Sequence, residues 1–241
     1  MSENLPQVDL IVPTLNEAHV LRSSVERIRA YLRDDFPYPA RIVVADNGST
    51  DGTGDIAEEL AREYSDVGVV RLNARGRGRA LRQAWSESAA DIVAYTDVDI
   101  STELPALDRM CRAIWEDGFD MAVGSRLMRE SKTTRGFKRE AISRIYNLFI
   151  KVFFWTCFSD AQCGCKAVSR RVVTDLIPSV QDEEWFFDTE LLVRGEKGGY
   201  RIKDISVTWI DDDDSRVKIV STAWKDIQGV FRVRRQLWMG Q

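Results

Sequence analysis

Short apolar runs alternate with amphipathic segments through the first half of this chain, and this alternation limits the folds open to it. The apolar runs predict strands, and the segments between them place apolar residues at helical spacing. Strands separated by helices form parallel βαβ units, with helices on both faces of one twisted sheet. The expected strands are 8–12, 42–45, 67–72, 92–96 and 121–123, and the expected helices are 16–32, 55–64, 78–88 and 104–115.

The second half of the chain, from about Arg129 onward, follows a different pattern. Residues 141–158 are strongly apolar and aromatic, and Arg144, Asn147 and Lys151 share a helical face opposite the apolar one. The remaining elements expected here are a helix over 185–197, a half-exposed strand over 200–209 and a basic amphipathic helix over 219–237.

Composition excludes several classes of protein. The 241 residues are 44% hydrophobic and 30% charged, which suits one α/β domain of ordinary size. A net charge of -4 gives no support for nucleic-acid binding. Four cysteines and one histidine form no recognisable zinc site or disulfide framework, and they favour a reduced compartment. Residues 1–9 lack the features of a signal peptide, and no charge-free apolar stretch is long enough to span a membrane.

Asp97 and Asp99 directly follow the expected strand 92–96. At the carboxyl end of a strand both carboxylates can turn toward one cation, and ligands of open α/β sheets bind at this edge. Hard divalent cations such as Mg²⁺ prefer oxygen ligands and keep positions open for substrate phosphates. The pair therefore predicts a metal that holds a diphosphate, although the same spacing is common in surface loops.

Two more polar loops follow expected strands. The first contains Pro13, Asn16 and Glu17, and the second contains Asp46 and Asn47. In a doubly wound sheet these loops gather at the edge that carries the aspartate pair. Asp46 lies at a strand end, where its carboxylate is expected to accept a hydrogen bond from a base or a ribose.

A local structural role competes with nucleotide binding for three residues of these loops. Asn16 or Thr14 would cap the first helix, and Asp51 would begin the next one, because such side chains commonly accept hydrogen bonds from helix N-termini. For Asn16 and Asp51 the local structural role is favoured at least as strongly as nucleotide binding.

Residues 75–79 read Arg-Gly-Arg-Gly-Arg and precede an expected helix. Glycines let a backbone approach a ligand, arginines offer planar bidentate donors to phosphate oxygens, and a helix N-terminus attracts phosphate. The stretch, with Arg77 at its centre, therefore predicts a phosphate contact. A solvated basic turn is the competing interpretation, and the glycine spacing matches neither a Walker nor a dinucleotide-binding motif.

These motifs together resemble the inverting family-two glycosyltransferases of GT-A fold, whose Rossmann-like sheet is mostly parallel. The second half is similar to the polyprenyl- or dolichyl-phosphate sugar synthases, and the likeness covers residues 8 to 235. The matching residues are Pro13, Asn16, Glu17, the 46–51 loop, 75–78, Asp97, Asp99, 124–126, Arg139, Ser143, 160–166, Phe187, Asp188 and Glu190.

The resemblance implies a nucleotide-sugar half at residues 1–129 and an acceptor half at 130–241 within one domain. Asp97 and Asp99 would bind Mg²⁺ or Mn²⁺, and with Arg126 and Asp160 they would form the catalytic group. The implied nucleotide-binding residues are Pro13, Asn16, Glu17, Asp46, Asn47, Arg77, Asp97 and Arg216; Arg126, Arg139 and Ser143 would hold an acceptor phosphate; Asp160 and Gln162 would border the sugar.

The chain departs from the family pattern at three places. Arg77 replaces the usual lysine, and Cys165 replaces a common aromatic residue. The run of four aspartates at 211–214 would repel a diphosphate beside Arg216, and a solvated loop accounts for it equally well.

The resemblance also implies the reaction. A hexose would pass from a nucleoside-diphosphate sugar, with UDP-glucose ahead of GDP-mannose, to polyprenyl phosphate with inversion at the anomeric centre. A phosphate nucleophile is already ionised near neutral pH, so no strong general base is needed. The alternative is a soluble glycan or protein acceptor, which would require a carboxylate base such as Asp188 or Glu190.

The apolar segment 141–158 and the basic segment 219–237 suggest where the lipid is met. Basic amphipathic helices lie in membrane interfaces, which predicts a peripheral enzyme on the cytoplasmic face with C-terminal interfacial helices. Packing into the core or into a dimer contact competes with this interpretation. The further partner left open is a second copy of the chain or a separate membrane subunit.

Overall fold

The computed structural model describes residues 5–134, 136–210 and 219–239. One sheet runs through both halves of the chain, with strand order β3-β2-β1-β4-β7-β5-β8. All neighbouring pairs are parallel except those of β7, which runs antiparallel to β4 and to β5. The strands are β1 Val8–Thr14, β2 Ala40–Asp46, β3 Val67–Arg71, β4 Ile92–Thr96, β5 Met121–Ser125, β7 Cys165–Ser169 and β8 Ile202–Ser206.

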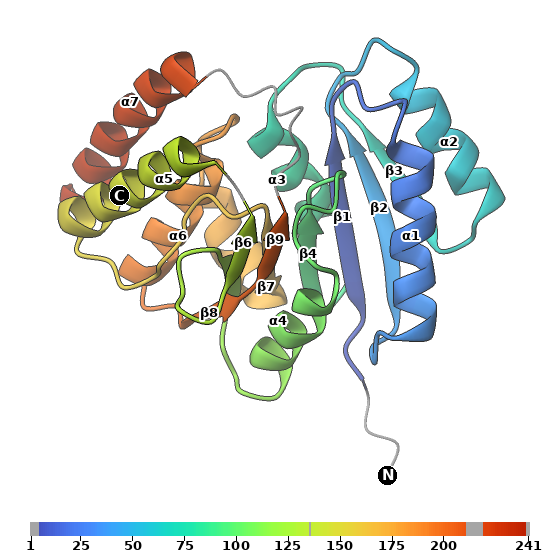
Figure 1. Cartoon of the computed structure of the whole chain (residues 1–241), viewed down its shortest axis with the longest axis horizontal. Helices are drawn as coiled ribbons and strands as arrows, with labels where there is room; N and C mark the ends of the chain where they lie inside the picture. Colours follow the sequence, from blue (N-terminus) through green and yellow to red (C-terminus); the bar gives the residue numbers. More distant parts are fainter. Residues whose placement is uncertain (1–4, 135, 211–218, 240–241) are drawn as a thin grey trace.

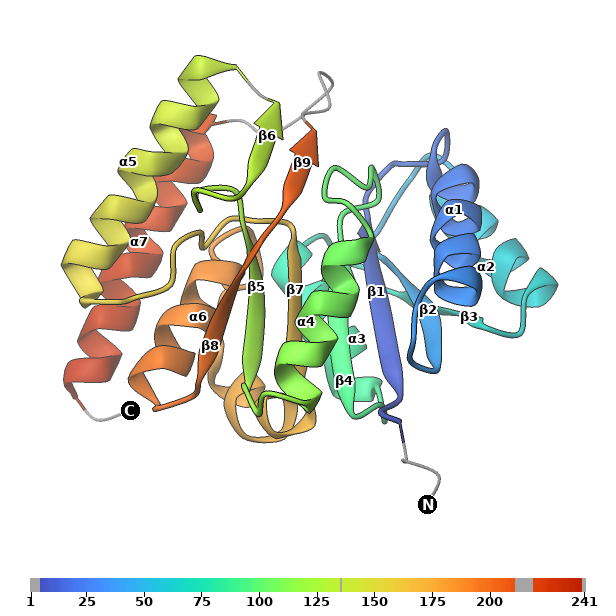
Figure 2. The same ribbon diagram turned by 60° about the horizontal axis from the view of Figure 1, so that its bottom comes forward.

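Helices cover both faces of this sheet, as expected (Figures 1 and 2). Inner strands are buried on both sides, so that Leu10 packs into one core and its neighbour Ile11 into the other. Helices α1 Leu21–Asp34, α2 Thr53–Glu63 and α4 Pro105–Trp115 cover the first face, and α3 Arg77–Glu87, α6 Phe187–Lys197 and the short turns Val172–Leu176 and Ile177–Ser179 cover the second.

Two long helices pack side by side beyond α6, at the edge of the molecule shown on the left in Figure 1. They are α5 Phe137–Phe154 and α7 Ile219–Trp238. The rings of Phe153 and Phe231 lie 5.7 Å apart across their contact. The helix expected over 141–158 is formed over 137–154 instead and ends where Trp155 has a left-handed backbone with φ of 55°. The basic helix expected over 219–237 is formed.

The structure corrects the expected elements at three points. Helix α1 begins at Leu21 rather than at Asn16, because Asn16 has a left-handed backbone with φ of 57°. The segment expected as one strand at 200–209 forms β8 and the separate strand β9 Thr208–Ile210, which pairs in parallel with β6 Lys132–Thr134. Strands β6 and β7 have no counterpart among the expected elements.

Candidate active site

The carboxyl ends of β1 and β2 bring the first two polar loops together. Thr14 and Asp46 are register partners at these ends. Asn16 donates its backbone N–H to Ser49 Oγ at 2.9 Å and accepts the backbone N–H of Thr50 on Oδ1 at 2.8 Å. The left-handed conformation of Asn16 thus joins the two loops instead of capping a helix, and the capping interpretation is wrong for this residue.

Neighbouring side chains of the same loops also hold backbone groups. Asn47 is buried and accepts the N–H of Gly76 at 2.6 Å, while the N–H of Glu17 donates to Thr53 Oγ1 at 2.8 Å. Asp51 accepts the N–H of Thr53, the first residue of α2, at 3.0 Å. The local interpretation of Asp51 is therefore confirmed. Pro13 and Glu17 are half-buried at this edge.

Asp46 is buried with one oxygen satisfied and the other not. Its Oδ1 accepts the backbone N–H of Ser49 at 3.2 Å, and its Oδ2 lies 3.7 Å from Arg71 Nε. Among the described residues no hydrogen bond reaches Oδ2. A Cβ at Gly54 would lie 2.7 Å from Oδ2, so glycine there keeps the carboxylate uncrowded. A buried acceptor without a donor is what a ribose or base N–H or O–H could satisfy.

Asp97 and Asp99 stand at the carboxyl end of β4, as expected. The Asp97 side chain is 40% exposed, and its Oδ1 lies 2.5 Å from Arg77 Nη2. Asp99 is exposed and accepts the N–H of Ser101 at 3.0 Å. Burial of the carboxyl group raises the pKa of Asp97, as do Asp99 and Asp188, whereas Arg77 opposes the rise.

The aspartate pair fits a hard divalent cation of the kind that works on diphosphates. Both donors are carboxylate oxygens on one chain turn, and within the described ranges no third His, Cys, Asp or Glu completes a metal-binding group. A cation held here would take its remaining ligands from water and substrate oxygens, as Mg²⁺ usually does in such sites.

Gly164 gives the Asp97 carboxylate its space. A Cβ at this position would lie 1.7 Å from Asp97 Oδ2, and the carbonyl of Gly164 accepts the N–H of Asp97 at 3.2 Å. Any side chain at residue 164 would displace the carboxylate. The glycine of the 160–166 motif is thus explained by one contact between segments far apart in sequence.

Arg77 is almost fully buried, so the interpretation of 75–79 as a solvated turn is wrong at its centre. Besides Asp97, its guanidinium lies 5.0 Å from the Tyr95 ring and 5.2 Å from the Trp185 ring. The flanking glycines do not leave space for a ligand as expected. A Cβ at Gly76 would lie 2.6 Å from Glu183 O, and one at Gly78 would lie 2.6 Å from Phe187 Cβ, so both glycines admit residues 182–187 instead.

A buried network of Lys166, Asp188 and Tyr95, which was not predicted from the sequence, holds Arg77 in place. Lys166 Nζ lies 3.0 Å from Asp188 Oδ1 and donates to Cys163 O at 2.6 Å. Tyr95 donates its hydroxyl to Asp188 Oδ1 at 2.5 Å, and Asp188 Oδ2 lies 3.5 Å from Arg77 Nη1. Burial, with the Asp188 carboxylate, raises the pKa of Tyr95 well above its usual value, which keeps the hydroxyl protonated. The lysine within the otherwise apolar segment 165–168 was the sequence feature that could have predicted a buried ion pair here.

Glu190 is a structural carboxylate. It is fully buried and accepts Arg194 Nε at 2.7 Å and Arg232 Nη2 at 2.6 Å. The backbone N–H groups of Gln181 and Asp182 donate to it as well. With four donors on two oxygens, it has no lone pair directed at a substrate proton.

Arg126 and Asp160 form one bidentate ion pair, although their expected ligands differ. Arg126 Nε and Nη2 lie 2.7 and 3.0 Å from the two Asp160 oxygens, and the Arg126 backbone N–H donates at 3.1 Å. Burial opposes ionisation of Asp160, but the Arg126 guanidinium outweighs it and holds the pKa of Asp160 below its ordinary value. Gln162 donates its backbone N–H to Asp160 at 3.2 Å, and the residue is exposed.

Helix α5 carries the expected acceptor residues Arg139 and Ser143 one turn apart. Ser143 is buried, and its Oγ makes no hydrogen bond to any residue that the structure describes. Arg139 is half-buried. Asn147, one turn further, is also buried, whereas Arg144, expected on the same helical face, is exposed.

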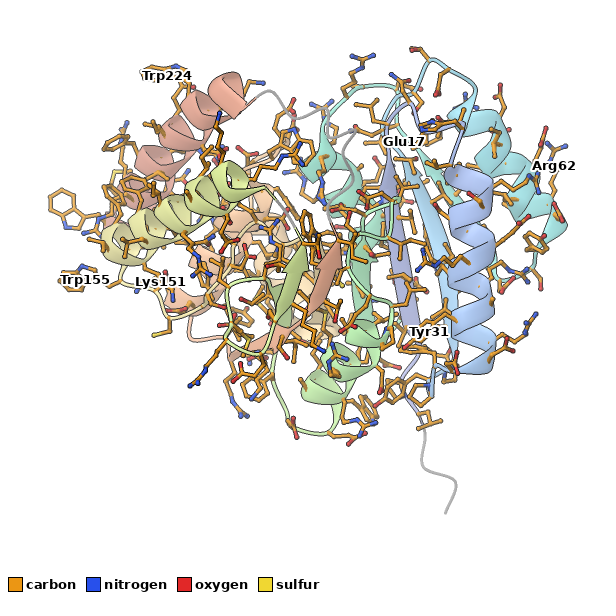
Figure 3. All side chains as sticks on the ribbon, in the orientation of Figure 1. Glu17, Tyr31, Arg62, Lys151, Trp155 and Trp224 are labelled. Carbon is orange, nitrogen blue, oxygen red and sulfur yellow. The ribbon has the colours of Figure 1, made fainter. Side chains whose placement is uncertain are left out.

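The outward side of α5 is mostly apolar, and that of α7 combines apolar residues with exposed cations. Ile145 is 68% exposed and Leu148 is 62% exposed, while the polar Ser143 and Asn147 point inward. Figure 3 shows Trp155 and Trp224 projecting from this side of the molecule. We call the whole surface the outer apolar face; it comprises Ile142, Ile145, Leu148, Phe149, Val152, Trp155, Trp224, Ile227, Phe231 and Trp238.

The roles expected for Arg216 and for the four aspartates at 211–214 stay predictions. Arg216 and the aspartate run at 211–214 lie outside the described residues.

Among the residues that are described, no helix is long and apolar enough to cross a bilayer.

Comparison with known proteins identifies the family. Residues 9–177 match the model of glycosyl transferase family 2. The chain is 33% identical to the glycosyltransferase AglD of Haloferax volcanii over 96% of its own length, but it spans only 37% of AglD. It is 28% identical to the dolichyl-phosphate beta-glucosyltransferase of Drosophila melanogaster, covering 89% of this chain and 71% of that one.

A solved structure supports the fold. Glucosyl-3-phosphoglycerate synthase from Mycobacterium tuberculosis, crystallised with Mn²⁺ and UDP-glucose, superposes with a TM-score of 0.67 at 17% identity, covering 94% of this chain and 78% of that one. The expected GT-A arrangement, a mostly parallel sheet between helices, is thereby confirmed. The matched family model extends from β1 through the Asp97–Asp99 pair and β7, and this chain is a member of glycosyltransferase family 2.

Proposed function

We propose that this glycosyltransferase transfers a hexose from a nucleoside-diphosphate sugar to polyprenyl phosphate, with inversion, at a membrane surface. The observation that carries the acceptor assignment is the division of α5. Its inward side holds the buried Ser143 hydroxyl one turn after Arg139, and its outward side is apolar. An amphiphile with a phosphate head and a hydrocarbon tail matches both sides of one helix.

The donor end of the site suits a nucleoside diphosphate. Asp46 offers a buried acceptor for the nucleoside, and Asp97 and Asp99 lie at the next strand end but one. A divalent cation, when bound to these carboxylates, would neutralise charge that develops on the leaving diphosphate. Arg77 is held beside Asp97 by Asp188, which places a second positive group at the same point.

The transfer step needs no strong base. An ionised phosphate oxygen attacks the anomeric carbon, the bond from that carbon to the diphosphate oxygen breaks, and its electron pair leaves with the nucleoside diphosphate. Asp160 is a weak proton acceptor because its pKa is lowered, so it acts by holding Arg126. In-line attack inverts the anomeric centre.

The soluble-acceptor alternative loses support at its proposed bases. An alcohol nucleophile must lose a proton, and Glu190 is occupied by four donors. Asp188 is bound by Tyr95 and Lys166. Neither carboxylate resembles an available general base. Relatives named as dolichyl-phosphate beta-glucosyltransferases favour glucose as the hexose, so we take UDP-glucose as the first donor to test and GDP-mannose as the second.

The outer apolar face would dock onto the cytoplasmic surface of a bilayer. Ten apolar side chains on two adjacent helices are exposed together, and isolated soluble proteins seldom expose so continuous a patch. Exposed cations flank them and complement anionic lipid headgroups: Lys138, Arg144, Lys225, Arg234 and Arg235.

The first experiment identifies the donor. Each nucleotide sugar is added with Mn²⁺, and the protein's thermal unfolding is recorded, because a ligand that binds only the native state raises the apparent stability. We expect UDP-glucose to give the largest increase in melting temperature.

The second experiment tests the acceptor. Donor labelled in the hexose is incubated with the enzyme and with vesicles that contain polyprenyl phosphate, and the label is partitioned between chloroform–methanol and water. We expect label in the organic phase. Asp99→Asn should lower the rate by about a hundredfold or more without changing the fold, whereas Asp117→Asn, an exposed aspartate after α4, should not.

Ser143→Ala should lower transfer to the lipid by about tenfold, since one hydrogen bond to a charged phosphate is lost. Ser86→Ala, on the exposed side of α3, is its matched control. Label that enters only a water-soluble glycan would refute the lipid acceptor.

A further inference from the structure

Asn147 joins helix α5 to the segment at 160–161 through one buried amide. Its Nδ2 donates to the carbonyl of Ser143 at 2.9 Å and lies 3.5 Å from Asp160 Oδ1. Its Oδ1 accepts the backbone N–H of Ala161 at 2.8 Å. The residue is 3% exposed, so these contacts are made without competition from water.

The amide is the contact between α5 and the Arg126–Asp160 pair. Asp160 belongs to the segment before β7, and Arg126 follows the end of β5. Asp160 receives Arg126 on both oxygens and the N–H of Gln162, and the Asn147 amide approaches the same Oδ1 from the helix side. The turn at 160–161 is thus tied to the helix that carries Ser143.

We infer that Asn147 is a positioning residue that fixes the Asp160–Arg126 pair relative to Ser143 on α5. This role rests on the proposed function, in which Ser143 and Arg126 hold the acceptor phosphate and Asp160 lies beside the reacting sugar. Asn147 acts through Asp160 and does not itself touch the substrate.

The placement of Asn147 joins lipid contact to catalysis. Residues on the outer apolar face, such as Ile145 and Leu148, are on the opposite side of the same helical turns. A rotation of α5 that buried Leu148 would withdraw the amide from Ala161 and Asp160. Seating the outer face on a bilayer therefore favours the rotation in which the Arg126–Asp160 pair is held in place.

Two substitutions separate positioning from simple packing. Asn147→Leu keeps the branched shape of the side chain but removes all three amide contacts. We expect kcat to fall about tenfold to a hundredfold with the KM for the donor unchanged. Asn147→Asp keeps an acceptor for Ala161 but places a second carboxylate beside Asp160, where like charges disfavour ionisation.

The pH profile of Asn147→Asp gives a readout that packing alone would not move. The other charged or titratable groups around Asp160 are Arg126, Lys166, Cys163 and Asp204. The added carboxylate should raise the pH at which Asp160 becomes protonated and its ion pair with Arg126 is lost. The acid limb of the kcat profile should therefore move up by about one pH unit. Gln83→Glu makes the same amide-to-carboxylate change beside Glu87 on the exposed side of α3 and should leave the pH profile of kcat unchanged.

A double-mutant cycle completes the test. If Asn147 acts through Asp160, Asn147→Leu should have little further effect on kcat in an Asp160→Asn background. Additive effects of the two substitutions, or an unshifted acid limb in folded Asn147→Asp, would overturn the positioning role. Transfer of the hexose to polyprenyl phosphate by the wild-type enzyme is measured in parallel, and its absence would refute the proposed function. In that case the kcat of each variant relative to wild type is measured from the release of nucleoside diphosphate instead.

Discussion

Helices α4 and α5 of this protein make opposite use of their apolar residues. In α4 the apolar side, which includes Leu107, Met110 and Ile114, is buried against the sheet. In α5 apolar residues such as Ile145 and Leu148 face outward, and the polar Ser143 and Asn147 are buried. Helix α5 does add Ile150 and Phe154 to a core, but for the residues just named the pattern of α4 is reversed.

The difference teaches that hydrophobic periodicity predicts a helix better than it predicts which side is buried. Burial of Ser143 and Asn147 costs free energy unless polar partners meet them, and Asn147 finds three such partners. Exposure of a row of large apolar side chains is equally unfavourable in water. Both costs disappear if the outer face lies in lipid and the inner face binds a phosphate.

The contrast between α4 and α5 is tested most directly by replacing one apolar residue of each helix with glutamate and measuring the free energy of unfolding. Leu107→Glu in α4 buries an unpaired carboxylate and should cost about 4 kcal/mol or more of unfolding free energy. Ile145→Glu in α5 should change it by less than about 0.5 kcal/mol, because the side chain is exposed. Urea unfolding followed by circular dichroism measures both, and equal losses would show that α5 is an ordinary core helix.

Lipid binding should show the reverse ranking. Ile145→Glu combined with Leu148→Glu removes two side chains that each contribute about 1.5–3 kcal/mol when buried in apolar surroundings, so vesicle binding should fall about a hundredfold or more. Trp115→Glu, an exposed apolar residue on α4, is the control and should leave binding unchanged. Cosedimentation with vesicles that contain anionic lipid provides the measurement. A similar loss for all variants would point to nonspecific adsorption.

The inner side of α7 allows a test by pH. Asp226 is 5% exposed, and burial, assisted by Asp182, raises its pKa from 3.8 to about 6. The folded state binds the proton more tightly, so this contribution to stability is full below pH 3.8 and is lost as pH rises toward 6. Asp226→Asn should therefore be more stable than wild type at pH 8 by about 1–3 kcal/mol, and the gain should vanish near pH 4. Unfolding curves at both pH values that gave identical differences would contradict this assignment.

Cysteine reactivity gives the smallest expected effect. Cys111 in α4 is fully buried, and burial raises the pKa of its thiol, whereas Cys157, just after α5, is exposed. A thiol reagent should modify Cys157 in the native protein and leave Cys111 unmodified until unfolding. Vesicles should slow the reaction of Cys157 by a few fold if the adjoining Trp155 enters the interface. Mass spectrometry of the labelled peptides distinguishes the two sites.

The strands of the nucleotide half were predictable from sequence because each is a short apolar run, and all but the edge strand β3 are buried over most of their length. β4 was expected with its observed bounds, and Asp97 and Asp99 were correctly placed at its end. Strand β7 was not predictable, because Lys166 interrupts its apolar run and forms its ion pair with Asp188, from a distant helix. Local periodicity contains no information about such a partner.

The candidate site shows the same limit. The residue types at Arg126 and Asp160 were recognisable, but their pairing depends on the packing of two segments 34 residues apart. Asn16 was ambiguous because a capping asparagine and a left-handed one have the same sequence signature. Asn147 went unnoticed as a site residue because an isolated asparagine on an apolar helix looks like part of a solvated stripe.

The reversed direction of β7 has a consequence for how this site is assembled. In an all-parallel sheet, only segments that leave strands reach the active edge. Because β7 runs the other way, residues 160–164 reach that edge before their strand begins, and they meet Asp97 and Arg126 from the opposite chain direction. One short reversed strand thus places residues that enter a strand beside residues that leave one, and the site draws on both.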